Sequence, residues 1–211
     1  MLSKQRFVIA GAVLSLSAVG ATARAAEDAL PKCPVTGEAV NFNVSTMTPD
    51  GPVFFCCKKC VGALEKDPAK FAAAVGEQRK ALEKRYKVQV VCPVSGEPID
   101  PKVSIEQDGQ QVHFCCNQCV EKFKADPAKY KSMLAASYTY QTKCPISGEE
   151  INPTTGVVLT SGEKVYTCCK RCAAKVGADA VKVAANLAAQ GYPVKPDDLK
   201  KAKPTEEKDG D

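Results

Sequence analysis

The stretch that decides the fold runs from Cys92 to Tyr130, CPVSGEPIDPKVSIEQDGQQVHFCCNQCVEKFKADPAKY, and the chain uses it nearly three times. A first copy spans Cys33 to Phe71, and a third begins at Cys144 and loses the pattern after Cys172. Each copy places one cysteine in C-P-[VI]-[ST]-G-E and, after 22 or 23 intervening residues, a C-C-x-x-C. Self-similarity of this kind is the signature of a tandem array of small structural units.

All 12 cysteines of the 211-residue chain fall within these copies. A unit of about 50 residues buries too little apolar surface to fold securely, so small domains of this size usually rely on a metal or on disulfides. An even number of cysteines in an exported chain is typical of a disulfide framework. A closed cluster of thiolates instead favours Zn²⁺ or Cu(I). The cysteine count alone leaves both readings open.

Turn residues and short apolar runs predict a β-hairpin in each copy. Proline and glycine follow the first cysteine and indicate a tight turn. The strands are expected at Val40–Met47 and Val53–Phe55, at Lys102–Glu106 and Val112–Phe114, and at Gly156–Thr160 and Val165–Thr167. Apolar residues at helical spacing follow the cysteine pair and predict a helix. The fold class is therefore a small α+β protein of tandem cysteine-rich ββα units joined by helices.

The same pattern sets the expected domain boundaries. Unit 1 covers residues 26–74, a helical linker covers 75–88, and unit 2 covers 89–133. Unit 3, residues 134–190, lacks the proline after Asp179, so a single helix is expected from Ala173 to Gln190. Residues 191–211 carry almost no apolar side chains and are expected to form a disordered tail.

Residues 1–25 are typical of a secretory signal peptide. Lys4 and Arg6 precede an apolar run, and Ala23-Arg24-Ala25 forms an A-x-A cleavage site. This predicts that the segment is removed and that the mature protein is periplasmic or secreted, with a retained membrane anchor as the alternative. No later segment is long and apolar enough to span a membrane. Cleavage leaves 26 basic against 24 acidic residues, a balance that argues against a nucleic-acid-binding surface.

The cysteine spacing predicts a metal site in each unit. In C-C-x-x-C, the second and last cysteines share one face of the first helical turn, where the helix N-terminus favours thiolates. The first cysteine of the pair ends a strand, and the turn cysteine starts the hairpin, so a ββα fold would bring four sulfurs together. The candidate metal ligands are Cys33, Cys56, Cys57, Cys60, Cys92, Cys115, Cys116, Cys119, Cys144, Cys168, Cys169 and Cys172. Zn²⁺ and Cu(I) are the candidate cations.

The pattern C-x22-C-x3-C through Cys92, Cys115 and Cys119, followed by an aromatic residue and Asp-Pro-x-x-Tyr, resembles the TRASH/YHS group of treble-clef-like metal-binding domains. The resemblance implies handling, sensing or storage of heavy metals, with the turn cysteine and the two cysteines flanking the helix start as ligands. Members of that group typically place a cysteine where this chain has Thr36, Ser95 and Ser147, and a serine where it has Cys57, Cys116 and Cys169. Two arrangements stay open: Cys57 and its equivalents complete a four-sulfur site, or a three-sulfur Cu(I) site leaves one thiol spare.

Together these features predict an exported, non-enzymatic protein that binds, buffers or traffics zinc or copper, alone or by delivery to another metal-handling protein. The alternatives are a thiol-disulfide oxidoreductase and a disulfide-stapled structural or interaction module. A redox C-x-x-C is expected in a βαβ context, which these hairpins do not provide. A disulfide from Cys33 to Cys60 would leave the neighbours Cys56 and Cys57 to pair, which is a strained linkage. His113, the only histidine, takes the place of Phe54 and Tyr166 in the other copies, which favours a packing or surface role.

Overall fold

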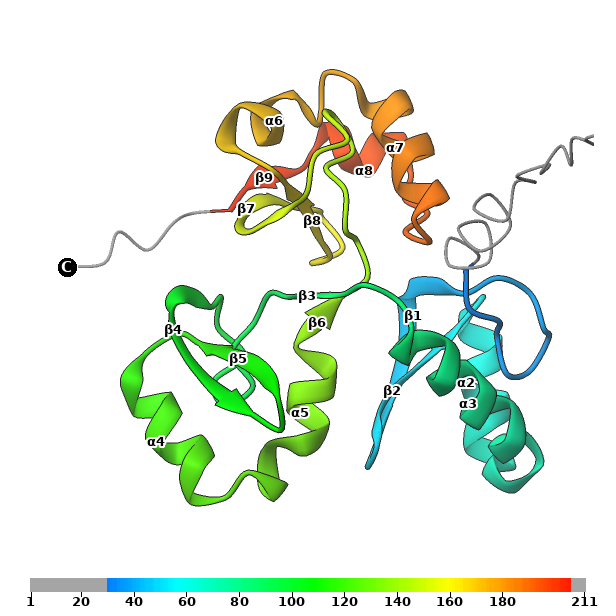
Figure 1. Cartoon of the computed structure of the whole chain (residues 1–211). Helices are drawn as coiled ribbons and strands as arrows, with labels where there is room; N and C mark the ends of the chain where they lie inside the picture. Colours follow the sequence, from blue (N-terminus) through cyan, green and yellow to red (C-terminus); the bar gives the residue numbers. More distant parts are fainter. Residues whose placement is uncertain (1–29, 206–211) are drawn as a thin grey trace, which may run out of the picture.

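The computed structural model describes residues 30–205. The expected signal peptide, residues 1–25, lies outside this range. Three units, drawn from blue to cyan, in green, and from yellow to red, surround a common centre (Figure 1). Within residues 30–205, no helix combines the length and the apolar character needed to cross a membrane. The chain is mixed α/β with small sheets, which confirms the coarse fold class expected from its sequence.

Each unit begins with an antiparallel hairpin. The three hairpins are β1 (Asn41–Thr48) with β2 (Gly51–Phe55), β4 (Asp100–Gln107) with β5 (Gln110–Phe114), and β7 (Asn152–Val158) with β8 (Lys164–Thr167). Asp108 and Gly109 both have positive φ, of 52° and 75°, in the two-residue turn between β4 and β5, as a twisted hairpin requires. All three hairpins have a register shift near the start of the first strand. The same register shift therefore recurs in all three hairpins, and in each of them the cysteine pair directly follows the second strand.

A helix follows each cysteine pair. These first helices are α2 (Lys58–Lys66), α4 (Asn117–Ala125) and α6 (Lys170–Lys175). Further helical segments follow as α3 (Pro68–Glu83) in unit 1, η1 (Ala128–Tyr130) and α5 (Lys131–Ala136) in unit 2, and α7 (Ala180–Ala189) in unit 3. The Asp67 side chain accepts a hydrogen bond from the Lys70 amide (3.2 Å) and Pro68 begins α3, so this helix starts with the expected cap and proline. It runs without interruption through the expected boundary at residues 74 and 75, because Val75 is buried against unit 1.

Each unit has its own small core between hairpin and helix. In unit 1 the buried Val53, Phe55 and Leu64 surround two of the cysteines. In unit 2 the Phe114 and Phe123 rings meet edge to face with centroids 5.3 Å apart. In units 1 and 2, aliphatic and aromatic side chains thus exclude water from one side of the cysteine group.

The units pack against one another through the segments that connect them. β3 (Val88–Gln89), shortly before the turn cysteine of unit 2, pairs antiparallel with β6 (Tyr138–Thr139), shortly before the turn cysteine of unit 3. α5 packs on β2 of unit 1, and a side chain at Gly51 would lie only 2.7 Å from the Ala135 methyl group. Glycine at this position therefore permits the close approach of units 1 and 2.

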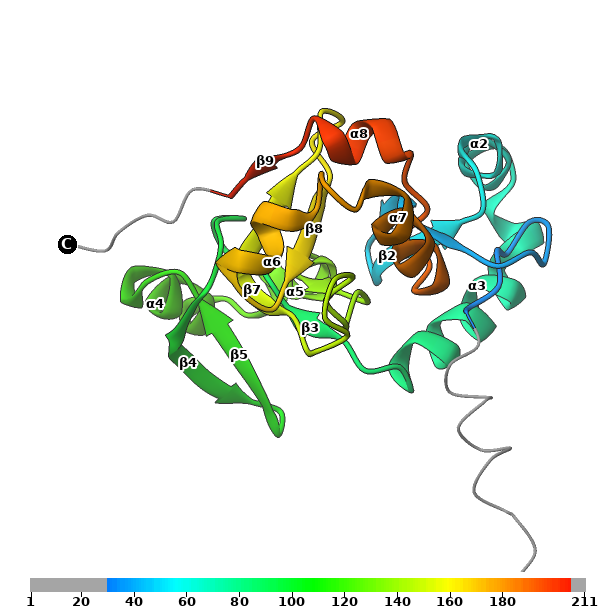
Figure 2. The same cartoon turned by 90° about the horizontal axis from the view of Figure 1, so that it is seen from above.

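A shared aromatic cluster of Phe42, Phe54, Tyr140 and Tyr192 joins unit 1 to unit 3. Phe42 stacks on Tyr140 with ring centroids 4.8 Å apart and lies 5.2 Å from Tyr192. The Phe42 amide donates to the Gly191 carbonyl (2.8 Å), which follows α7. Figure 2 shows this end of α7 beside unit 1. The three units consequently pack against one another and are not independent domains joined by linkers.

The structure corrects the expected continuous helix from Ala173 to Gln190. α6 ends at Lys175, and α7 begins at Ala180. Between them Gly177 is in ordinary van der Waals contact with the backbone of residues 199 and 200, since an added Cβ would lie 3.4 Å from the Leu199 carbonyl oxygen. A segment from near the C-terminus thus packs against the break.

The expectation of a disordered tail is wrong for residues 191–205. They include α8 (Pro196–Lys200) and β9 (Lys203–Pro204), which pairs with β7. Leu199 is fully buried in the core of unit 3, where Val194 and Ala202 also pack. A few well-placed apolar residues anchor a segment whose average composition is polar. Residues 206–211 lie outside the described range.

Candidate metal centres

The first cysteine of each unit sits in a tight turn fixed by backbone hydrogen bonds. The Cys33 amide donates to the Glu38 carbonyl (2.7 Å), and the Gly37 amide donates to the Cys33 carbonyl (2.9 Å). Gly37 has φ of +77°, a conformation that glycine adopts without steric cost. The same pair of bonds recurs at Cys92 and at Cys144, with distances of 2.7 to 2.9 Å. Proline and glycine in C-P-x-x-G therefore shape a loop that presents one buried sulfur.

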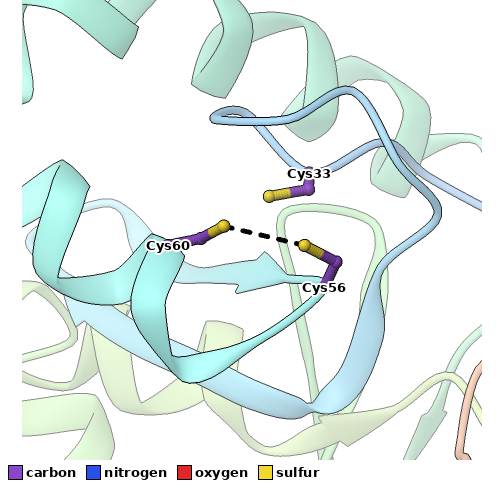
Figure 3. Close-up of side chains that lie close together, drawn as sticks. All are labelled: Cys33, Cys56 and Cys60. Atoms are coloured by element: carbon purple, nitrogen blue, oxygen red, sulfur yellow. Dashed lines mark hydrogen bonds between the residues drawn. The ribbon is translucent and has the colours of Figure 1, made fainter.

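The other two sulfurs come from the junction between strand and helix. Cys56 follows β2 directly, and Cys60 lies in the first turn of α2. Cys57 between them is the N-cap residue, with extended backbone at φ −157° and ψ 163°. The corresponding N-cap residues Cys116 and Cys169 have nearly the same angles. The strand end and the helix start thus turn Cys56 and Cys60 toward the turn cysteine, as Figure 3 shows.

In each unit three sulfurs form a cluster, here called the sulfur trio. Within a trio all sulfurs lie within 4.8 Å of one another, and two of the three residues are buried or nearly so. The trios are Cys33, Cys56, Cys60; Cys92, Cys115, Cys119; and Cys144, Cys168, Cys172. The strand and helix sulfurs are 3.6 Å apart in all three units.

This spacing suits a thiophilic cation. Ligands at about 2.3 Å from a tetrahedral Zn²⁺ lie about 3.8 Å from one another, close to the separations observed within the trios. Soft sulfur donors also suit Cu(I). The three groups of sulfurs therefore fit a bound metal ion in both donor type and spacing.

The fourth cysteine of each unit stands beside its trio. Cys57 Sγ lies 3.6 Å from Cys60 Sγ, whereas Cys116 Sγ and Cys169 Sγ each lie 3.7 Å from the strand cysteine before them. None of the three belongs to the set of sulfurs that are mutually within 4.8 Å. Cys57 is exposed, and its two counterparts are partly buried. Of the twelve candidate ligands, the structure brings nine into trios and places three at the solvent edge.

A hydroxyl group contacts the strand cysteine in every unit. Thr36 Oγ1, Ser95 Oγ and Ser147 Oγ each lie 3.3 Å from the sulfur of Cys56, Cys115 or Cys168. Each oxygen also accepts a bond from the amide of the glutamate that follows the turn glycine. Sequence reasoning noted these positions only as departures from a family pattern. Their fixed place three residues after the turn cysteine was the available signal.

The protein environment separates the acidities of the sulfurs in a trio. Burial opposes ionisation of Cys33, but hydrogen bonds with the Cys56 backbone and the Thr36 hydroxyl outweigh it and lower the Cys33 pKa to about 7. The pKa values of Cys92 and Cys144 are lowered to about 7 in the same way, with Ser95 and Ser147 as the hydroxyl partners. These turn thiols ionise near neutral pH.

The helix cysteines behave in the opposite sense. Burial, together with the neighbouring strand sulfur, raises the pKa of Cys119 and of Cys172 to about 12 and that of Cys60 well above its usual value. Three thiolates this close repel one another, so without a cation the trio retains protons. A metal ion must displace those protons, and its charge would stabilise the resulting thiolates.

His113 is not a member of any trio, although it lies two residues before Cys115. Its backbone amide and carbonyl instead bond to the side chain of Gln89. Gln89 and two further glutamines, Gln78 and Gln141, make matching bonds in their own units. Sequence reasoning missed all three, although the spacing Q-x-x-C precedes the second and third turn cysteines.

No protein-family model matches the chain, and neither a curated protein nor a solved structure shows significant similarity to it. The assignment of a chemical role therefore depends on the geometry of the three sulfur trios.

Proposed function

We propose that the protein binds thiophilic metal ions, Zn²⁺ or Cu(I), one at each sulfur trio, and that it buffers or traffics them outside the cytoplasm. The observation that carries this proposal is the threefold recurrence of three sulfurs within 4.8 Å, two of them from a strand-to-helix junction and one from a tight turn. Recurrence with different surrounding residues indicates that the sulfur geometry is what each unit maintains. The resemblance to treble-clef-like TRASH/YHS domains supports the same role.

The role of the fourth cysteine in each unit distinguishes a Zn²⁺ site from a Cu(I) site. Zn²⁺ in a closed site takes four ligands, and Cys57, Cys116 and Cys169 are near enough to join after a side-chain rotation. Cu(I) is satisfied by three thiolates, which would leave these cysteines as exposed thiols available to an incoming or departing ligand. All twelve cysteines thus belong to the proposed sites, nine as the trios and three as the fourth ligand of a zinc site or the spare thiol of a copper site.

The cellular part of the proposal depends on the sequence of residues 1–25, which is typical of a signal peptide. In the periplasm or outside the cell, a chain with three thiolate sites would hold metal ions and pass them to another metal-handling protein. A binding and buffering role requires no catalytic group, and we propose that the protein is not an enzyme.

The test is to purify the exported protein and measure bound metals per chain together with free thiols, before and after a chelator. About three Zn²⁺ or Cu(I) per chain, with thiols becoming reactive on chelation, supports the proposal. The variant Cys56→Ser/Cys60→Ser should bind one ion fewer, while the matched variant Cys57→Ser should keep three Cu(I). Absence of metal with no free thiols would instead establish a disulfide-stapled module.

A second candidate, thiol-disulfide exchange, is favoured by one specific observation. In each C-x-x-C the exposed or partly exposed first cysteine has a lowered pKa, chiefly through the backbone amide at the helix start, and the last cysteine has a raised pKa. A low-pKa thiolate next to a buried thiol is the arrangement of redox-active pairs. Insulin reduction that is lost in Cys57→Ser/Cys116→Ser/Cys169→Ser would support this candidate, and full alkylation protection by metal without such activity would exclude it.

A further inference from the structure

Each unit contains one buried glutamine whose side-chain amide makes three hydrogen bonds to the backbone. In unit 1, Gln78 Oε1 accepts from the Phe54 amide (2.9 Å), and Gln78 Nε2 donates to the carbonyls of Phe54 and Lys32 (both 2.8 Å). The exposed fractions of Gln78, Gln89 and Gln141 are only 3%, 6% and 1%. A buried amide with three satisfied bonds holds its partners firmly, because breaking any of them leaves a polar group without water.

The other two units repeat the same three bonds. Gln89 Oε1 accepts from the His113 amide (2.8 Å), and its Nε2 donates to the carbonyls of His113 (2.7 Å) and Val91 (3.2 Å). Gln141 Oε1 accepts from the Tyr166 amide (2.9 Å), and its Nε2 donates to the carbonyls of Tyr166 (2.6 Å) and Lys143 (3.3 Å). We call each of these three-bond arrangements a glutamine bridge.

The partners of a glutamine bridge are the residues next to the trio. Lys32, Val91 and Lys143 come immediately before the turn cysteines, whereas Phe54, His113 and Tyr166 stand two residues before the strand cysteines. The amide therefore ties the segment that carries the first sulfur to the segment that carries the second. It extends the strand edge by one peptide-like group, since a primary amide offers an acceptor and two donors.

The bridging glutamine reaches its place by two different routes along the chain. In units 2 and 3 it lies three residues before the turn cysteine, but unit 1 has Leu30 at that position. There Gln78 supplies the same bonds from helix α3, which follows the hairpin in the sequence, whereas Gln89 and Gln141 precede theirs. Because different segments of the chain supply the same contacts, duplication of one repeat does not explain their recurrence. We infer that the cysteine site requires these hydrogen bonds.

We propose that Gln78, Gln89 and Gln141 are positioning residues that set the spacing between the turn sulfur and the strand sulfur, and so prepare each trio for its cation before the cation arrives. This inference rests on the proposed metal-binding function. Partners of this kind, which orient ligands without touching the metal, typically change metal affinity about ten- to a hundredfold when they are removed.

The test uses the full-length chain and the variant Gln78→Met, in which the side chain keeps its length and apolar contacts but loses its amide. Zn²⁺ activity is set with a competing chelator, and N-ethylmaleimide labelling of each cysteine is read by peptide mass spectrometry. The free Zn²⁺ needed to protect Cys33, Cys56 and Cys60 should rise about ten- to a hundredfold. The cysteines of units 2 and 3 act as internal controls and should keep their wild-type midpoints.

Two further variants distinguish positioning from general stability. Gln78→Glu, which keeps the acceptor but loses both N–H donors, should shift the unit 1 midpoint in the same direction. Leu82→Ala removes a buried side chain from the same helix, and it should lower the melting temperature without moving that midpoint. The proposal is overturned by an unchanged midpoint in Gln78→Met, or by an equal shift in Leu82→Ala. Failure of the metal-binding function itself would look different, because Zn²⁺ would then protect no cysteine of the wild-type chain.

Discussion

At the scale of single residues, the trio is surrounded by groups that adjust the chemistry of sulfur. The hydroxyls of Thr36, Ser95 and Ser147 donate to or accept from a trio sulfur in every unit. A hydroxyl that donates to a thiolate withdraws negative charge from it and fixes its direction. These side chains would therefore influence how tightly a bound cation is held, without touching it.

Replacing the hydroxyl should weaken the site without unfolding it. We expect Ser147→Ala to lower Zn²⁺ affinity at Cys144, Cys168 and Cys172 by about tenfold, measured by chelator competition. Ser161→Ala, an exposed hairpin-turn serine of the same unit, is the matched control and should leave the affinity unchanged. Equal affinities for the two variants would show that the hydroxyl contributes nothing to binding.

Proton release is the residue-scale signature of metal binding. Cys119 has a pKa of about 12 without metal, because of burial and its sulfur neighbours, so its thiol is protonated at neutral pH. Since a cation requires the thiolate, binding should release at least one proton per site at pH 8 and more below pH 7, where Cys92 is also protonated. Affinity should therefore fall as the pH is lowered. Calorimetry in buffers of different ionisation enthalpy measures the proton count; a count of zero would contradict the proposed ligands.

At the scale of elements, the hairpins, the helix starts and the turn cysteines were predictable from sequence. Proline, glycine and alternating apolar residues encode them over a few neighbouring positions, and the structure confirms a hairpin followed by a helix in each unit. The sequence could not show whether all four sulfurs of a unit come together. In unit 1, Cys60 joins the trio and Cys57 does not, and the side-chain direction of the N-cap residue Cys57 is not specified by spacing.

The C-terminal elements were not predictable because they depend on long-range contacts. Composition averaged over residues 191–211 indicates disorder, yet Leu199 is fully buried in the core cluster that also contains Val157 of β7, Ala173 of α6 and Leu187 of α7. Likewise, residues 173–190 contain no proline, yet the helix is interrupted between α6 and α7, where Gly177 contacts the backbone of residues 199 and 200. Buried Leu199 and the pairing of β9 with β7 thus anchor this segment, and such tertiary contacts override local propensity.

This anchoring can be measured by removing the leucine side chain. Leu199→Ala should reduce the free energy of unfolding by about 2 to 5 kcal/mol, the usual cost of a large-to-small change in a core. Val181→Ala, at a position that is 72% exposed on the neighbouring α7, should change it by less than about 0.5 kcal/mol. Denaturant unfolding compares the two variants, and a similarly small loss for both would mean that α8 does not stabilise unit 3.

At the scale of the whole molecule, the three units are connected by more than their linkers. The Tyr192 hydroxyl accepts hydrogen bonds from the amides of Tyr140 (2.8 Å) and Gln141 (3.0 Å) and contacts Thr139 Oγ1 (2.8 Å). It therefore joins the segment after α7 to the segment that carries the unit 3 glutamine bridge. The same tyrosine lies against Phe42 of unit 1.

We expect Tyr192→Phe to cost about 1 to 3 kcal/mol, because the Tyr140 amide loses its hydroxyl acceptor and the Gln141 amide keeps only Thr139 Oγ1 (3.1 Å). Tyr86→Phe is the matched control, since Tyr86 is 64% exposed and the same oxygen atom is removed. Thermal and denaturant unfolding followed by circular dichroism provide the comparison. If both variants were as stable as the wild type, the central contact would have no role in holding the units together.

The bond from the Phe42 amide to the Gly191 carbonyl has a consequence for how the protein is made. Gly191, at φ +87°, packs so closely on the Phe42 ring that a side chain there would overlap it. Synthesis proceeds from the N-terminus, so the first hairpin emerges about 150 residues before its last partner. Until the segment after α7 has been made, the Phe42 ring and amide lack this partner on the nascent chain, so the first hairpin gains its last contact only when synthesis is nearly complete.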